Sequence, residues 1–187
     1  MARSLTRPLG KKVRAGKTTF ASLLAGGDRR SLGRASDAVA LVLQDPARLA
    51  ELVHCLWSDE AVVRMRAADA VEKVSRERPE LLHAFKAELL GLAGESRQQE
   101  VLWHLAQIIP RLRLTRTERQ RGIAQLKEYL QDRSAILRTL ALQSLGDMAG
   151  DDPALREEVI NLIEEALHSG TAAMKARARK LLVQLGA

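Results

Sequence analysis

Apolar residues in this chain recur at helical spacing, and the pattern itself repeats along the sequence. Four segments align: 63–74, 101–112, 137–148 and 174–185. Successive copies begin 38, 36 and 37 residues apart, and each has an apolar residue at the positions of Val63, Val71 and Val74. Small residues gather near Ala67, and a fainter copy begins at Arg34. Apolar residues spaced by three, four and seven lie on one face of a helix, so each copy predicts an amphipathic helix.

A second helix is predicted before each copy, with its own start signal. Pro46 and Pro153 each follow an aspartate, and proline is favoured at the first helical position because that position needs no N–H donor. Thr115 and Glu118 have the spacing of a capping box. The predicted helices are 36–44, 46–57, 59–77, 79–91, 97–109, 116–131, 135–149, 153–168 and 172–185, with a further helical turn around Phe20.

Short links between helices of this length favour antiparallel pairs that stack on their neighbours. The sequence therefore predicts an all-α fold, an α-α superhelix of about five antiparallel helix pairs. We expect residues 35–187 to form the repeat domain. Residues 1–34 would be a basic N-terminal arm, either partly disordered or a degenerate first repeat, whose deletion leaves the rest folded.

The repeat resembles the HEAT-repeat family, and the likeness covers roughly residues 35–187. That family has an aspartate in the turn six residues before an arginine of the second helix, and Asp132 and Arg138 match this spacing. Ser58 precedes Arg64 at the same spacing, so the pattern is kept only in part. The chain also looks like the bacterial HEAT-like proteins named after phycobilisome lyases. The resemblance implies an armadillo-like solenoid in which Arg64 and Arg138 link neighbouring repeats; it implies no particular activity.

Charge is distributed unevenly. Residues 1–34 contain nine Lys or Arg and one acidic residue, whereas the other 153 residues contain 21 basic and 22 acidic residues. The positive charge of the arm includes Lys11, Lys12, Arg14 and Lys17, which we name as candidate contacts. No apolar stretch is long enough to cross a bilayer, so we expect no membrane insertion and a cytoplasmic monomer. An organelle transit peptide is an alternative for the arginine-rich arm.

No convincing catalytic constellation is present. Gly16-Lys17-Thr18 resembles the end of a phosphate-binding loop but lacks the earlier glycine and the preceding strand. The Glu-x-x-His motifs at Glu51 and Glu80 lack the two further glutamates of a di-iron site. Cys55 follows His54 directly, and adjacent helical residues do not face each other. We therefore expect no enzyme, no cofactor and no metal.

Two binding hypotheses remain for the face formed by the second helix of each pair. The first is a protein-binding scaffold or adaptor, because solenoids offer extended concave surfaces. The second is a nucleic-acid-binding solenoid that contacts phosphates through the arm and a basic stripe. The stripe consists of residues at equivalent repeat positions: Arg66, Lys73, His104, Arg111 and Arg177. The identity of a partner is not encoded in any motif of the sequence.

Overall fold

The computed structural model describes residues 18–28, 31–150 and 152–186, and this part of the chain contains α-helices and no strands. Ten α-helices follow one another: α1 (Phe20–Leu24), α2 (Ala35–Gln44), α3 (Leu49–His54), α4 (Ala61–Glu77), α5 (Lys86–Glu95), α6 (Gln99–Ile108), α7 (Arg116–Tyr129), α8 (Ala135–Ala149), α9 (Pro153–Ser169) and α10 (Ala172–Leu185). Short 3₁₀ turns flank α3, precede α5 and extend α6: Pro46–Arg48, Cys55–Trp57, Pro79–Phe85 and Ile109–Arg111. The all-α prediction is confirmed, but the helix predicted at 79–91 is α-helical only from Lys86, after the 3₁₀ stretch Pro79–Phe85.

The helix starts follow the signals in the sequence. The Thr115 hydroxyl accepts a hydrogen bond from the Glu118 N–H, and the Glu118 carboxylate accepts one from the Thr115 N–H, which completes the predicted capping box. Asp152 caps α9 by accepting from the Leu155 N–H. After Asp45 and Arg78 the proline instead opens a 3₁₀ turn. These caps satisfy N–H groups that have no partner within the helix.

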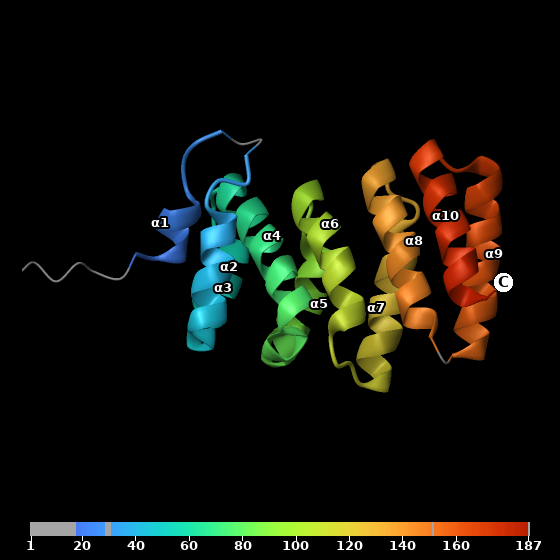
Figure 1. Ribbon diagram of the computed structural model, residues 1–187, viewed down its shortest axis with the longest axis horizontal. Helices are drawn as coiled ribbons and strands as arrows, with labels where there is room; N and C mark the ends of the chain where they lie inside the picture. Colours follow the sequence, from blue (N-terminus) through green and yellow to red (C-terminus); the bar gives the residue numbers. More distant parts are fainter. Residues whose placement is uncertain (1–17, 29–30, 151, 187) are drawn as a thin grey trace, which may run out of the picture.

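The helices lie side by side in a row that runs from α1 at one end to α9 and α10 at the other (Figure 1). The even-numbered helices pack on one another in sequence order, α2 on α4, α4 on α6, α6 on α8 and α8 on α10. The intervening helices pack beside them, and α5 also contacts α7. We call the even-numbered helices the second helices, because each is the second member of a predicted pair.

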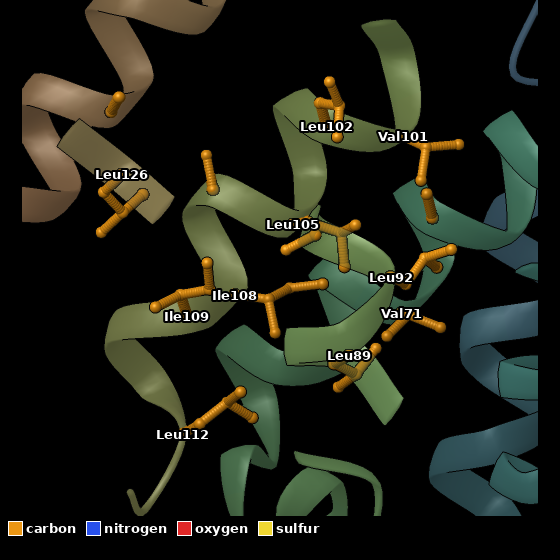
Figure 2. Close-up of a cluster of buried hydrophobic side chains, with 14 of the residues drawn as sticks. Val71, Leu89, Leu92, Val101, Leu102, Leu105, Ile108, Ile109, Leu112 and Leu126 are labelled. Carbon is orange, nitrogen blue, oxygen red and sulfur yellow. The ribbon is translucent and has the colours of Figure 1, made fainter. Parts of the chain in front are cut away.

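One hydrophobic core runs the length of the row. Figure 2 shows part of it, where Val71 of α4, Leu89 and Leu92 of α5 and the apolar residues of α6 surround one another. The apolar spacing that recurs in each repeat explains this packing, since Val63, Val71 and Val74 are all at most 1% exposed. Gly146 lies inside α8 rather than at its end, and the Leu181 side chain packs so closely there that a β-carbon would lie 2.6 Å from it.

Polar contacts tie the other helices together. Tyr129 of α7 donates a hydrogen bond of 2.6 Å to the Ala93 carbonyl of α5, and burial raises the pKa of the Tyr129 hydroxyl. Lys86 of α5 lies 2.7 Å from the Glu118 carboxylate of α7. The hydrogen bond from Lys86, with that from the Thr115 N–H, lowers the pKa of Glu118 to about 2. Among the described helices, none is long and apolar enough to cross a membrane.

Part of the basic arm packs on the repeat domain. Phe20, Leu23 and Leu24 of α1 are buried in the core, and the Phe20 N–H donates to the Glu51 carboxylate at 2.7 Å. The Arg48 guanidinium of the second pair stacks over the Phe20 ring at 4.3 Å from its centroid. Residues 18–24 are therefore in contact with the second helix pair, and the boundary predicted at residue 34 and the effect of deleting the arm stay predictions.

Candidate functional site

The exposed side of the second helices is the candidate site, because the sequence placed both binding hypotheses there. Residues three, four and seven apart share one side of a helix. On α8 this line is Ile136, Leu140, Gln143 and Asp147, and repeat alignment gives the equivalent line on each other second helix. We call the surface formed by these lines the second-helix face. It divides into a polar band toward the C-terminal ends of the helices and an apolar band toward their N-terminal ends.

The polar band begins with paired charges between α4 and α6. Lys73 donates to the Asp69 carboxylate at 2.8 Å, one turn earlier on the same helix. Arg76 and Arg111 both donate to the Glu72 carboxylate at 2.7 Å, and Arg111 also donates to the Ser75 hydroxyl. Glu72 is 1% exposed, so both arginines serve a buried carboxylate. Removing either arginine would leave the buried charge of Glu72 less well compensated, which is unfavourable.

Two titratable groups in this band have shifted pKa values. Burial alone would raise the pKa of Glu72, but the hydrogen bonds from Arg76 and Arg111 outweigh it and lower the pKa. Burial lowers the pKa of His104, and this outweighs the opposing attraction of Asp69 and Glu72. His104 is therefore a neutral imidazole at neutral pH, and its Nδ1 atom is buried with no partner among the described residues.

Between α8 and α10 the polar band consists of amides and one carboxylate. Arg177 donates to the Gln143 side-chain oxygen at 3.0 Å. The amide groups of Gln143 and Gln184 donate to Asp147 at 2.7 and 3.1 Å. This chain of hydrogen bonds links two neighbouring second helices across their exposed side, and both amides donate to the same Asp147 oxygen, Oδ1.

The apolar band lies beside these polar groups and was not identified from the sequence. It consists of partly or fully exposed apolar side chains on three second helices: Val62, Met65, Trp103, Ile136 and Leu140. Ile136 is 53% exposed, and the Trp103 indole N–H reaches α8 by donating to the Ser134 hydroxyl at 3.2 Å. Glu100 and His104 interrupt the band on α6. Its signal was available in the repeat alignment, where Arg66 and His104 have Leu140 as their equivalent on α8.

Arg66 lies on the α4 line of this face but is covered by the chain itself. Its guanidinium donates to main-chain carbonyls of the segment 24–31, at 2.7 Å to Leu24, 2.6 Å to Gly26, 2.9 Å to Asp28 and 3.0 Å to Ser31. The side chain is 2% exposed. Gly33 approaches so closely that a β-carbon there would lie 2.8 Å from the guanidinium. Arg66 thus fixes the N-terminal segment onto the first complete repeat.

These contacts change the predicted basic stripe. The prediction of Arg66 as a surface contact is wrong, because its side chain is buried and donates to the carbonyls of Leu24, Gly26, Asp28 and Ser31. Lys73 and Arg111 are only partly exposed and pair with carboxylates, His104 is uncharged, and Arg177 is bonded to Gln143. The structure therefore aligns these residues on one face but does not make them a row of free cations. The predicted arm contacts Lys11, Lys12, Arg14 and Lys17 lie outside the described residues.

Arg64 of α4 and Arg138 of α8 are the arginines that follow a turn residue by six positions. Arg64 donates to the carbonyls of Ser58 and Asp59 and, from its Nε atom, to the Gln98 side chain of the next repeat at 2.8 Å. Arg138 binds the Asp132 carbonyl of its own turn at 2.7 Å. The interpretation that Arg64 links neighbouring repeats is therefore supported by its contact with Gln98, whereas the hydrogen bonds of Arg138 lie within its own turn. An open pocket of about 340 Å³ lies beside Arg138, between the last two helix pairs.

The residues considered for catalysis are engaged in other contacts. Burial, with a contribution from Glu51, raises the pKa of the Cys55 thiol to about 11, and the thiol donates to the Glu51 carbonyl. The Glu51 carboxylate accepts from Arg48 and the Phe20 N–H, while Glu80 pairs with Arg78. Within the described ranges no group of three His, Cys, Asp or Glu residues could hold a metal ion. Lys17 of the Gly-Lys-Thr segment lies outside those ranges.

Comparison with known proteins supports the fold alone. No family model matches the sequence, and no curated protein matches it. Among solved structures, the crystal structure of an engineered protein determined by the Northeast Structural Genomics Consortium is similar, with a TM-score of 0.61 and 18% sequence identity. The similarity covers 89% of this chain and 79% of that one. At this identity the likeness extends to the helical architecture and carries no function.

Proposed function

We propose that this chain is a non-enzymatic protein-interaction module, a HEAT-like solenoid of about five antiparallel helix pairs that binds a partner through its second-helix face. The observation that carries this proposal is the apolar band beside a self-paired polar band. Apolar side chains clustered on an otherwise polar surface mark protein contact sites. A protein partner that buries Ile136 and Leu140 can also hydrogen-bond to the amides of the polar band, which gives it orientation as well as contact area.

The band has the character of a contact surface in its chemistry as well as its position. Trp103 and Met65 are residue types enriched at protein interfaces, and the charges beside them are already paired, so a partner need not strip water from free ions. A phosphate backbone, in contrast, draws its affinity from unpaired Lys and Arg. The nucleic-acid alternative is therefore less well supported on this face, because Lys73 and Arg111 are paired and His104 is neutral.

The test is an affinity purification of tagged full-length protein from native extract, with and without nuclease, compared between wild type and Ile136→Glu. We expect a partner that survives nuclease and is lost from the variant. Leu32→Glu is the matched control, because Leu32 is 46% exposed and lies outside the band. This variant introduces the same charge and should retain the partner. Recovery that depends on nucleic acid, or equal loss in both variants, would refute the proposal.

A further inference from the structure

The free side of α10, at the end of the row, has a composition that the other second helices do not share. Four of its residues are spaced by four, three and four, and so form one line along the helix: Ala172, Ala176, Arg179 and Val183. All four are exposed, and Val183 is 82% exposed, more than any other large apolar residue described. We call this line the end face, together with the flanking Lys175 and with Lys180, which lies at the border with the second-helix face.

In the interior of the row, the equivalent line packs on the next repeat. The equivalents of Arg179 are Ala68, Ala106 and Leu142, which are at most 1% exposed. The Ala106 carbonyl accepts from Ser144 of the next second helix, and Gly146 on α8 contacts Leu181 of α10 at short range. Along this line one second helix packs against the next. On α10 the same line is exposed.

The charges on the end face are unpaired. α10 contains four basic residues and no acidic residue. Among the described residues no carboxylate forms an ion pair with Lys175, Arg179 or Lys180, including the acidic residues of the neighbouring α9. A helix that packs on this line is favoured if it supplies carboxylates that pair with these cations. Basic residues placed against Arg179 would instead repel it.

We propose that the end face of α10 binds an acidic amphipathic helix of a partner protein, which extends the row in trans. Two alanines allow its backbone to approach closely, Val183 receives its apolar stripe, and Lys175, Arg179 and Lys180 pair with acidic residues on either side of that stripe. A phosphate backbone would satisfy the cations but gain nothing from Val183, which is why a helix fits this surface better.

A second copy stacked head to tail, so that its first helices continue the row, does not offer the required charge. Its first two helices, α1 and α2, contain one acidic residue, Asp37, and that residue already pairs with Arg34 at 2.7 Å. The partner is thus distinguished by carboxylates at helical spacing.

The experiment uses the full-length chain and three fluorescent probes followed by anisotropy. The first is a synthetic peptide of about 20 residues with glutamates flanking a leucine stripe at helical spacing. The second has the same composition in scrambled order, without the stripe, and the third is a single-stranded RNA of equal charge. We expect the first probe to bind with an affinity that falls as salt rises, and the scrambled probe to bind markedly more weakly.

Variants then locate the binding. Arg179→Glu/Lys180→Glu should weaken binding of the first peptide by about tenfold or more, and Val183→Ser should weaken it severalfold. Arg113→Glu/Arg116→Glu is the control with the same charge change, at exposed arginines that form no ion pair with the described residues. Thermal melts of each variant confirm folding. Failure of the peptide to bind, equal binding of the scrambled peptide, or preference for RNA would overturn the proposal.

Discussion

The two ends of the row are closed in opposite ways, although both derive from the same repeat. At the N-terminal end, Arg66 is buried under the chain's own segment 24–31 and its donors are taken up by main-chain carbonyls. At the C-terminal end, Arg177 occupies the equivalent repeat position and, among the described residues, donates to the Gln143 side chain alone. The same residue type is thus buried and hydrogen-bonded to the main chain at one end and lies at the surface at the other, because among the described residues only Arg66 is covered by a neighbouring segment.

The largest expected effect comes from removing the covering segment. Deleting residues 1–34 removes the buried side chains of Phe20, Leu23 and Leu24 and the carbonyls that Arg66 binds, so the free energy of unfolding should fall by about 5 kcal/mol or more. Deleting only residues 1–17 should change it little, since those contacts remain. Urea denaturation followed by circular dichroism measures both, and equal stability of the two truncations would contradict the anchoring contacts.

Arg66→Ala removes the hydrogen bonds from Arg66 to the N-terminal segment, which we call the clasp, without shortening the chain. The change leaves several carbonyls without their donor and opens a cavity, so we expect a loss of about 3 kcal/mol in the free energy of unfolding. Arg177→Ala at the equivalent position should cost less than about 1 kcal/mol, because its hydrogen bond is partly exposed. Similar losses from both substitutions in urea denaturation would show that the two ends do not differ.

Cys55 provides a reporter of opening at the N-terminal end. The thiol is buried with a pKa of about 11, and Glu51, one turn earlier, accepts from Phe20. Because a thiol reacts as its thiolate, labelling by a disulfide reagent at pH 8 should be slow in the wild type. Arg66→Ala should speed it by about tenfold or more through local opening, while Arg177→Ala leaves it unchanged. Fast labelling of the wild-type protein would contradict this packing.

Two glycines of the N-terminal segment give a smaller and matched effect. Gly33 has a φ of +52° and lies against the Arg66 guanidinium, whereas Gly26 has a φ of +69° and open space around it. Gly26→Ala should cost about 1 kcal/mol for the left-handed backbone alone. We expect Gly33→Ala to cost about 1 kcal/mol more, because the methyl group displaces the guanidinium. Thermal melts of the pair separate backbone strain from loss of the clasp.

The smallest effect is predicted at the other end. Val183→Ser removes an apolar side chain that is 82% exposed, so the free energy of unfolding should change by less than about 0.5 kcal/mol. A substantial loss of stability would mean that Val183 is covered in solution by the protein itself. The same substitution weakens the peptide binding proposed for the end face, so stability and binding report on Val183 separately.

The helices were predictable because their signals are local. Prolines, the Thr115 capping box and apolar spacing act within a turn or two, and the Lys73–Asp69 pair follows from their separation by four residues. The burial of Arg66 was not predictable in this way, since its partners lie 35 to 42 residues earlier in a segment that has no repeat equivalent. Repeat alignment gave its position on the helix but could not show what covers it.

The pairing of Arg111 with Glu72 lies between these cases. The two residues are 39 apart, close to one repeat length, so their neighbourhood follows from the stacking of α4 and α6. Their hydrogen bond depends on side-chain direction, which composition does not encode. For the same reason a stripe of basic letters in an alignment was not sufficient to predict a surface of free positive charge.

The clasp at Arg66 also bears on how this chain can change over generations. An arginine that binds main-chain carbonyls recognises the path of the segment and not the identity of its side chains. Substitutions within residues 25–31 that keep this path should therefore be tolerated, while Arg66 and Gly33 should be nearly fixed. A comparison of related sequences would then show variable positions before an invariant glycine, with an invariant arginine 33 residues after that glycine.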